Sequence, residues 1–351
     1  MTRAHEQQQT ASHRAADGTM TAAVLEAPRR FELRPVPRPV PGNEQVRVWL
    51  EGCGVCASNV PPWEGRPWFG YPFAPGAPGH EGWGVIDAVG ARVEGFEVGQ
   101  RVALLSMHAY AEYDVAEADQ LVPLPESLDG VALPGEPLGC AVNVLRRAEV
   151  EPGHTVAIVG VGFFGALLAR LCVKAGARVI AIARRKASLE VARRQGAEHT
   201  IPMTDTQQVV AQVAELTGGW MCDRVIEATG QQEPLDLASL LLRIRGRLVI
   251  AGYHQDGPRQ VNMQQWNWRG LDVINAHERD PSLYIDGLRK AIELVSDGAL
   301  DPSPLFTTNL PLNRLNEAIR LTAERPDGFV KALVYSDDQA MRRAREQGRL
   351  P

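Results

Sequence analysis

Residues 155–171, TVAIVGVGFFGALLARL, carry the pattern that decides the fold. Residues 156–159 are apolar and form a run short enough for a buried strand, and the apolar positions at the end of the stretch are typical of a helix. Between them lie Gly160, Gly162 and Gly165, a G-x-G-x-x-G fingerprint. In this setting the first glycine permits a tight turn, the second lets the backbone approach a pyrophosphate, and the third lets strand and helix pack closely. The stretch therefore predicts a dinucleotide-binding unit, with the helix N-terminus directed at the phosphates.

Outward from this stretch, strand and helix patterns alternate. The strand RVIAIAR, residues 178–184, is followed by a helix pattern over residues 186–197, and the strands DRVIEATG and GRLVIAGY come later. Apolar strands that alternate with amphipathic helices are typical of a parallel sheet covered on both faces. We therefore expect an α/β fold with a doubly wound parallel sheet of the Rossmann kind.

The end of the second strand predicts which nucleotide this unit binds. The fingerprint requires an acidic residue about 20 positions on, which would bind the ribose hydroxyls of NAD. Ala183 stands at that position and is followed by Arg184, Arg185 and Lys186. Guanidinium groups pair bidentately with phosphate oxygens, so arginines in place of a carboxylate favour the 2′-phosphate of NADP(H). A solvated basic helix start is the alternative interpretation of the same residues.

The first third of the chain has a different character. It is rich in strand patterns, such as EQVRVWLEG and EGWGVIDAVG, with clusters of glycine and proline between them. Residues 35–42, PVPRPVPG, are expected to be extended, because each proline removes a backbone donor and restricts the residue before it. The final strand, VKALVYS, has no βαβ partner nearby and is expected to return to this first domain. A chain of 351 residues is therefore expected to form two domains.

Composition excludes several classes of protein. The net charge is −5, from 37 basic and 42 acidic residues, which gives no bulk attraction for nucleic acid or an anionic membrane surface. No stretch reaches the ~18 apolar residues of a membrane span, so a soluble protein is expected. The five cysteines are an odd number in a large chain, which favours a reducing, cytoplasmic location over a disulfide framework. Residues 1–19 lack the apolar run of a signal peptide and are expected to be a disordered tail.

Two of these cysteines, Cys53 and Cys56, are separated by two residues. Such a pair can be a redox dithiol, half of a structural zinc clamp, or one metal ligand beside a cysteine that only packs. No thioredoxin-like unit surrounds the pair, which argues against the redox interpretation. Partners elsewhere in the chain decide between the other two.

Those partners come with a family resemblance. HEGWG at residues 80–84, VG at 89–90 and GQRV at 99–102 resemble the signature of the zinc-containing medium-chain alcohol dehydrogenases. GVCASN at 54–59 resembles the cysteine-ligand loop of the same family. GEPL at 135–138 resembles the variant in its polyol (sorbitol) and threonine dehydrogenase branch, where a glutamate replaces the second cysteine. The resemblance runs from about residue 22 to 335, with the glycine fingerprint in its expected place.

The resemblance implies a GroES-like β domain beside a Rossmann domain, with the active site in the cleft. The expected bounds are a tail at 1–19, the GroES-like catalytic domain at 20–142, the Rossmann domain at 143–290, a return to the catalytic domain at 291–336 and a polar tail at 337–351. The family pairs sheets across a dimer axis, which implies a homodimer or homotetramer.

The resemblance also implies the metal ligands. Cys56, His80 and Glu136 take the positions of the protein ligands of one catalytic zinc, and Glu81 ligates directly or through water. The cysteine at position 53 then only packs. Cys140, four residues past Glu136, would share its helix face and is the alternative third ligand.

Three departures from the family pattern stand out. The segment RVALLSMHAYAEYDV has none of the four cysteines that form a structural zinc lobe in many relatives, so one metal per chain is expected. Asn59 replaces an aspartate that supports the ligand histidine, and we expect the amide to lower the basicity of that ligand. Pro61 replaces a relay histidine, which leaves Ser58 to accept the hydroxyl proton, with His108 or water to carry it onward.

Together these residues predict a zinc-dependent oxidoreductase that transfers a hydride between NADP(H) and a secondary alcohol or ketone. Polar groups in residues 61–72 and 252–260 favour a polyol, cyclitol or sugar as the substrate. A zinc-free NADPH enone or quinone reductase of the same superfamily is one alternative, and a non-catalytic NADPH-binding protein is another. The expected cofactor contacts are Gly160, Gly162, Phe163, Phe164, Gly165, Arg184, Arg185, Ala228, Thr229 and Lys331.

Overall fold

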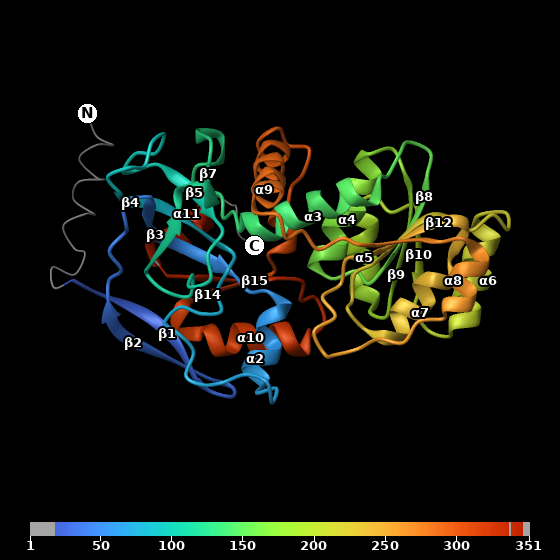
Figure 1. The fold of residues 1–351 in the computed structure, drawn as a ribbon, viewed down its shortest axis with the longest axis horizontal. Coiled ribbons are helices and arrows are strands. Elements are labelled where there is room, and N and C mark those ends of the chain that lie inside the picture. The colour runs from blue at the N-terminus through green and yellow to red at the C-terminus, as the bar shows by residue number, and fades with distance from the viewer. Residues whose placement is uncertain (1–17, 337, 347–351) are drawn as a thin grey trace. The chain divides into compact units, whose positions relative to one another are not determined.

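The computed structural model describes residues 18–336 and 338–346. They form two compact units (Figure 1). Unit 1 contains residues 18–134, 308–324 and the described residues from 332 onward, and unit 2 contains Gly135–Thr307 and Arg325–Lys331. The tail expected at the N-terminus lies outside the described residues, apart from its last two positions. The domain bounds given above stay a prediction.

Unit 2 is built on a six-stranded parallel sheet in the order β10-β9-β8-β11-β12-β13. The order reverses between β8 and β11, which is the switch point of a doubly wound sheet. This confirms the α/β class with a Rossmann-type sheet. The strands are β8 (Thr155–Val159), β9 (Arg178–Ala183), β10 (His199–Pro202), β11 (Cys222–Glu227), β12 (Leu242–Ile250) and β13 (Asp272–Asn275).

Helices cover both faces of this sheet. In Figure 1, α4 and α5 lie on one side of the strands, and α6 and α8 lie on the other. Ala157, Ile158 and Val159 are therefore fully buried, which explains why the strands read as continuous apolar runs. The helices are α3 (Gly135–Ala148), α4 (Phe163–Lys174), α5 (Lys186–Arg194), α6 (Thr206–Leu216), α7 (Gln232–Leu240), α8 (Met263–Arg269), α9 (Pro281–Ser296) and the short η4 (Ser303–Leu305).

The turn between β8 and α4 requires two of its glycines. Gly160 has a φ of +100°, and a Cβ there would lie 2.4 Å from Thr229 Cγ2. A Cβ at Gly165 would lie 2.0 Å from the Gly160 carbonyl oxygen. A larger residue at either position would displace the helix from the strand, so the turn and the close packing depend on glycine.

Unit 1 is rich in strands. Its sheet has seven, in the order β14-β15-β3-β4-β5-β7 with β6 paired to β3, while β1 and β2 form a separate antiparallel pair. The strands are β1 (Thr19–Ala27), β2 (Arg30–Pro37), β3 (Gln45–Gly54), β4 (Gly82–Val89), β5 (Arg101–Leu104), β6 (Tyr113–Glu117), β7 (Leu121–Pro123), β14 (Thr308–Pro311) and β15 (Ala332–Tyr335). The helices and 3₁₀ turns are η1 (Ala57–Asn59), α2 (Val60–Glu64), η2 (Ala118–Gln120), η3 (Glu126–Leu128), η5 (Leu312–Arg314), α10 (Leu315–Glu324) and α11 (Asp338–Glu346).

The last strand of the chain extends the sheet of unit 1. β15 runs antiparallel to β3, with Leu333 opposite Gly54. The Val55 N–H donates to the Ala332 carbonyl at 2.9 Å. The sequence predicted that this strand returns to the first domain, and the pairing confirms it. The C-terminal segment therefore holds the end of β3.

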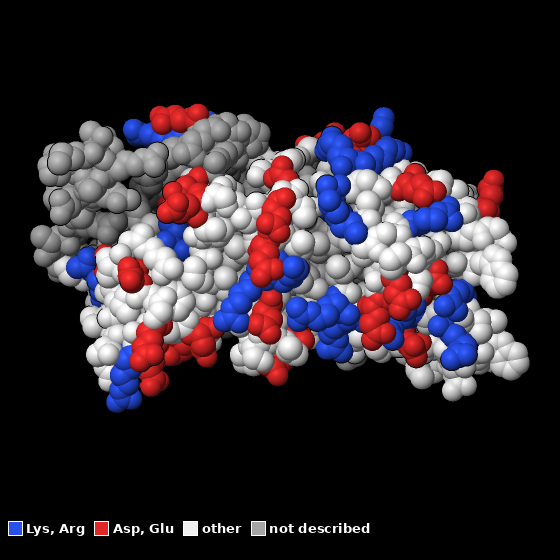
Figure 2. Space-filling view, turned by 90° about the horizontal axis from the view of Figure 1, so that it is seen from above, with Lys and Arg blue, Asp and Glu red and all other residues white. Residues whose placement is uncertain are grey.

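The segment after β15 was expected to be a polar tail or a frayed helix. Its residues 338–346 form α11, in which Ala340 is buried. Of the helices in the described part of the chain, none has both the length and the apolar character that a bilayer span requires. Figure 2 shows basic and acidic side chains interspersed on the face it displays, in keeping with the small net charge.

Candidate active site

The loop after β3 carries the first predicted ligand. Cys56 precedes η1 in an extended conformation (φ −78°, ψ 147°), and α2 follows η1 directly. Pro61 and Pro62 lie in the first turn of α2, where a missing N–H is tolerated because that turn has no helical acceptors to bond. Ser58 is half-buried within η1, two residues after Cys56. The loop thus lies between the end of a strand and a helix with two prolines in its first turn.

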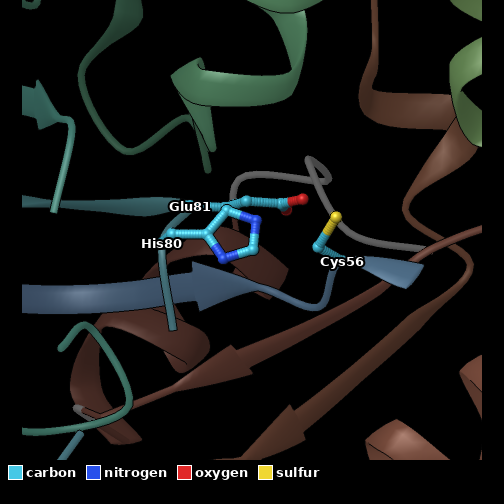
Figure 3. Close-up of side chains that lie close together, drawn as sticks. All are labelled: Cys56, His80 and Glu81. Carbon is cyan, nitrogen blue, oxygen red and sulfur yellow. The ribbon is translucent and has the colours of Figure 1, made fainter. Parts of the chain in front are cut away.

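Cys56, His80 and Glu81 lie in one cluster (Figure 3). The thiol sulfur, a ring nitrogen and a carboxylate oxygen are all within 4.8 Å of one another. Glu81 is fully buried, and the other two residues are half-buried. Figure 3 shows Cys56 arriving from the loop after β3, while His80 and Glu81 come from the segment before β4. Thiolate, imidazole and carboxylate are donors that zinc accepts, so the three residues fit that metal.

The hydrogen bond of the His80 ring determines which nitrogen is available. Nδ1 lies 2.9 Å from the Pro78 carbonyl oxygen. A carbonyl oxygen only accepts, so Nδ1 carries the ring proton and Nε2 keeps its lone pair. Backbone carbonyls are common partners of metal-binding histidines, because they fix both the tautomer and the ring orientation. The ring is therefore prepared to ligate through Nε2.

Asn59 reaches both ligand loops through their backbone. Its Nδ2 donates to the Pro78 carbonyl at 3.0 Å, the same oxygen that faces the His80 ring. Its Oδ1 accepts from the Cys56 N–H at 3.3 Å and from the Tyr110 hydroxyl at 2.7 Å. The sequence predicted that the amide of Asn59 lowers the basicity of the ligand histidine. The Pro78 carbonyl oxygen bonds both the Asn59 amide and the His80 ring, and the effect on basicity stays a prediction.

Close packing at the end of β3 admits the Glu81 carboxylate. A Cβ at Gly54 would lie 1.9 Å from Glu81 Oε2, so a larger residue would displace the carboxylate. Cys53 is 1 % exposed, and its thiol bonds the Gly54 carbonyl at 3.2 Å. The two cysteines therefore differ: Cys56 joins the cluster, and Cys53 packs in the core.

The tryptophans of α2 and of the loop after it differ in their burial. Trp63 is buried, and its Nε1 donates to Asn316 Oδ1 at 3.3 Å. Trp68 is 54 % exposed, and its ring contacts Phe69 at a centroid distance of 5.9 Å. Trp63 is therefore a core residue, whereas Trp68 remains accessible.

The remaining predicted ligand, Glu136, belongs to unit 2. It lies in the first turn of α3, and Cys140 follows one turn later on the same face, as its spacing predicted. The Cys140 thiol donates to Glu136 Oε1 at 3.3 Å, and Tyr284 of α9 donates its hydroxyl to the same oxygen. Burial, together with the Glu136 charge, raises the pKa of Tyr284, so the hydroxyl keeps its proton. Tyr284 could not be predicted, since a tyrosine within an amphipathic helix carries no motif.

A cavity of about 230 Å³ lies beside the turn between β8 and α4. A Cβ built on Gly162 would have no described atom within 4 Å. The backbone at Gly162 is therefore accessible to a ligand. Gly162 and Arg185 are the predicted cofactor residues in the lining. The lining also includes Val161, Ser188, Thr307, Asp327 and Phe329.

Arg184 and Arg185 follow β9 and differ in their surroundings. Arg184 is exposed, whereas Arg185 is half-buried and donates to the carbonyls of Arg325 at 3.1 Å and Phe329 at 3.3 Å. Burial lowers the pKa of Arg185, Asp327 opposes this effect, and the Arg184 charge adds to it. Two cationic groups therefore influence each other at the end of β9.

Phe163, Phe164 and Lys331 were expected to lie near the pyrophosphate turn. The Phe163 ring lies 5.8 Å from that of Phe306, and Lys331 Nζ lies 4.8 Å from the Phe163 ring centroid. Phe163 and Lys331 are both buried, whereas Phe164 is half-buried. The phenyl ring and the ammonium group thus pack on each other at the start of α4.

A buried carboxylate fixes the turn after β11, which contains the predicted cofactor residues Ala228 and Thr229. Glu227 is fully buried and accepts from the Thr229 N–H at 2.6 Å. His254 Nε2 lies 2.9 Å from its other oxygen, and Arg259 Nε donates to His254 Nδ1 at 2.9 Å. The polar groups of residues 252–260 favoured a polyol substrate in the sequence. Two of them, His254 and Arg259, form hydrogen bonds within unit 2, and their contact with a substrate stays a prediction.

Two family models match parts of the chain. The alcohol dehydrogenase GroES-like domain matches residues 42–126, and the zinc-binding dehydrogenase model matches residues 160–296. The first range lies in unit 1 and the second in unit 2.

Individual proteins match over most of the chain. A sorbitol dehydrogenase of Halalkalibacterium halodurans is 26 % identical over 323 residues, which cover 82 % of this chain and 91 % of the relative. A sorbitol dehydrogenase of Gallus gallus is 28 % identical over 348 residues, which cover 88 % of this chain and 93 % of the relative. A crystal structure described as a zinc-binding dehydrogenase from Sinorhizobium meliloti, bound to NADP, has a TM-score of 0.77 at 25 % identity and covers 90 % of this chain and 99 % of that one.

Proposed function

Because the chain belongs to the zinc-containing medium-chain alcohol dehydrogenase superfamily, with the pattern of its polyol branch, we propose that it is a zinc-dependent dehydrogenase that transfers hydride between NADP(H) and a secondary alcohol or ketone. The reaction class is that of an NAD(P)-dependent alcohol dehydrogenase acting on a CH–OH group of a small molecule. The choice of zinc, of NADP(H) and of the substrate class is our proposal.

The convergence of Cys56, His80 and Glu81 carries this proposal. Three donors of different chemistry, two of them from one segment and one from another, lie within 4.8 Å of one another. The His80 ring is oriented by its bond from Nδ1 to the Pro78 carbonyl, and Gly54 leaves room for the buried carboxylate. We assign Cys56, His80 and Glu136 to the metal, with Glu81 binding it directly or through water, and this set matches the mixed donors of a catalytic zinc site.

When bound, zinc supplies a Lewis acid for the substrate oxygen, and the nicotinamide supplies the hydride acceptor. Within the chain, we assign the substrate hydroxyl proton to Ser58 Oγ. Pro61 has no group that exchanges protons, and His108 lies 4.0 Å from an Asp114 oxygen, outside the Cys56 cluster. Water therefore takes the proton onward from Ser58 in this scheme.

We propose NADP(H) as the preferred nucleotide. Ala183 stands where an NAD enzyme of this fold needs an acid, Arg184 and Arg185 follow it, and Arg185 lines the cavity beside Gly162. The relative from Sinorhizobium meliloti is bound to NADP, which supports the same preference. We assign the remaining cofactor contacts to the glycine turn, Phe164, Ala228, Thr229 and Lys331.

We propose a polyol, cyclitol or sugar as the substrate, since the sorbitol dehydrogenases above cover most of the chain and Glu136 stands in the position typical of their branch. A homodimer or homotetramer is proposed from the family resemblance alone. A cytoplasmic location is proposed because none of the five cysteines, all within the described residues, forms a disulfide, which suits a reducing compartment.

Two measurements test the reaction. Metal analysis of the purified protein is expected to give about one zinc per chain, and turnover with a panel of polyols, read by NADPH fluorescence, is expected to be lost after chelator treatment. A protein without zinc that reduces enones would instead be the zinc-free reductase. Zinc without turnover on any alcohol in the panel would contradict the proposed substrate class.

The cofactor preference has its own test. Arg184→Asp places a carboxylate at the end of β9, where it would repel a 2′-phosphate and bind ribose hydroxyls. We expect its affinity for NADP⁺ to fall at least ~10-fold while its affinity for NAD⁺ is kept or rises, because a charge pair to phosphate is exchanged for a repulsion. Unchanged NADP⁺ binding would remove Arg184 from the proposed site.

A further inference from the structure

Helices α3 and α9 approach each other unusually closely. A Cβ at Gly139 would lie 2.8 Å from the Leu288 backbone nitrogen, and a Cβ at Gly287 would lie 2.4 Å from Asn143 Nδ2. Each helix therefore presents a glycine at the point where the other crosses it. Backbones can pack this tightly only where side chains are absent, so the two glycines determine the spacing of the helices.

This spacing brings Tyr284 to Glu136. Tyr284 lies one turn before the Gly287–Leu288 contact on α9, and Glu136 lies one turn before Gly139 on α3. The tyrosine hydroxyl donates to Glu136 Oε1, and the Cys140 sulfur lies 3.1 Å from that hydroxyl.

Tyr284 and Cys140 donate hydrogen bonds to the same carboxylate oxygen of Glu136. The Cys140 thiol donates to Oε1 at 3.3 Å, and the Tyr284 hydroxyl donates to it as well. Glu136 Oε2 accepts no hydrogen bond from the described residues. A carboxylate whose one oxygen is held by two donors has few accessible rotamers, and its second oxygen stays available for another ligand.

We propose that Tyr284, with Cys140 beside it, is a positioning residue that holds the Glu136 carboxylate in the orientation needed to bind the metal. This inference rests on the proposed function, in which Glu136 is a ligand. It assigns Cys140 to the support of that ligand and not to the metal. The glycine contacts between α3 and α9 are then part of the site, because they determine whether the hydroxyl reaches the carboxylate.

The test is a double-mutant cycle read by zinc affinity of the full-length protein. Zinc dissociation constants are measured by competition with a chromogenic chelator for the wild type, Tyr284→Phe, Glu136→Gln and the double variant. Tyr253→Phe, a tyrosine 64 % exposed in the same unit, is the matched control. Thermal unfolding of each metal-free variant shows whether the fold is kept.

We expect Tyr284→Phe to weaken zinc binding about 10- to 100-fold, the usual effect of removing an outer partner of a ligand. Glu136→Gln should weaken it at least as much, and the double variant should match Glu136→Gln, because the tyrosine acts through that carboxylate. Tyr253→Phe should bind zinc like the wild type.

Two results would overturn the positioning role alone. One is a Tyr284→Phe variant that binds zinc as tightly as the wild type. The other is a loss on Tyr284→Phe that adds in full to the loss on Glu136→Gln, which would show a general effect on the fold. A wild-type protein that takes up no zinc overturns the proposed function itself and this inference with it.

Discussion

The amide of Asn59 connects the two loops that carry Cys56 and His80. It accepts on one side and donates on the other, and the Pro78 carbonyl that it bonds also holds the His80 ring. A carboxylate at this position could not donate to that carbonyl. The amide therefore suits the contacts found in this chain, and its hydrogen bonds link the backbone positions of both proposed ligands.

Tyr110 completes this connection, and its removal is the first prediction. Its side chain is fully buried, and burial raises its pKa well above the usual range, so it remains a donor to Asn59. Tyr110→Phe keeps the ring and loses the bond, which should lower the free energy of unfolding by ~1 kcal/mol and weaken zinc binding about 10-fold. Urea unfolding and chelator competition measure the two effects. Equal zinc affinity in the wild type and Tyr110→Phe would show that the Asn59 amide keeps its orientation without the Tyr110 hydroxyl.

The cysteines are predicted to differ in reactivity. Burial raises the pKa of Cys172 to about 12 and that of Cys222 to about 12. At pH 8 neither should form a thiolate in the folded protein, so iodoacetamide should leave both unmodified. Cys56 should be alkylated in metal-free protein and protected once zinc is added. Peptide mass spectrometry after a timed reaction measures the modification of all three cysteines. Equal labelling of Cys56 with and without zinc would argue against its role as a ligand.

At the scale of elements, the turn after β11 depends on one buried acid. Glu227 accepts from the backbone of the turn on one oxygen and from His254 on the other, and Arg259 also donates to the Gly230 carbonyl at 2.8 Å. The loop after β12 is in this way attached to the turn after β11. A sequence cannot reveal such an attachment, because the partners are about 30 residues apart and follow no common spacing.

The prediction at this scale is the effect of Glu227→Gln. An amide nitrogen would face one of the donors that now bond the carboxylate, and charge-assisted bonds would be lost. We expect the free energy of unfolding to fall by ~2 kcal/mol and NADP⁺ to bind more weakly. Glu233→Gln, an exposed acid in the first turn of α7, is the matched control and should behave like the wild type. Urea unfolding and nucleotide titration measure both, and a variant as stable as the wild type would contradict the structural role.

At the scale of the whole molecule, unit 1 depends on both ends of the chain. β15 pairs with the end of β3, and Val55, next to Cys56, donates to Ala332. A chain that stops at residue 331 lacks this strand. We expect it to lose zinc binding, because the Cys56 loop leaves from an unsupported strand end, while unit 2 still binds NADP⁺. Isothermal titration with each ligand separates the two outcomes, and zinc binding at wild-type affinity would show that β3 holds the loop alone.

Much of the molecule could be predicted from sequence, for identifiable reasons. In the β8–α4 turn and the HEGWG segment, the role of each residue depends on its near neighbours in the chain. The sequence pattern alone therefore predicts these roles. Tyr284 and Tyr110 act across distances of 148 and 51 residues, on Glu136 and Asn59. Those contacts depend on which helices and loops pack against each other, as α3 and α9 do at Gly139 and Gly287. No local sequence pattern predicts that packing.

The pairing of β15 with β3 also has a consequence for the nascent protein. Cys56, His80 and Glu81 leave the ribosome early, but β15, which pairs with the strand before Cys56, is the last strand to be made. The about 250 residues between them take on the order of 10–50 s to translate at roughly 5–20 residues per second. During that interval the thiol is attached to an incomplete sheet, open to oxidants and to stray metal ions. We therefore expect the proposed zinc site to be completed only at the end of synthesis, and a cell that is short of zinc or under oxidative stress should accumulate full-length protein without zinc.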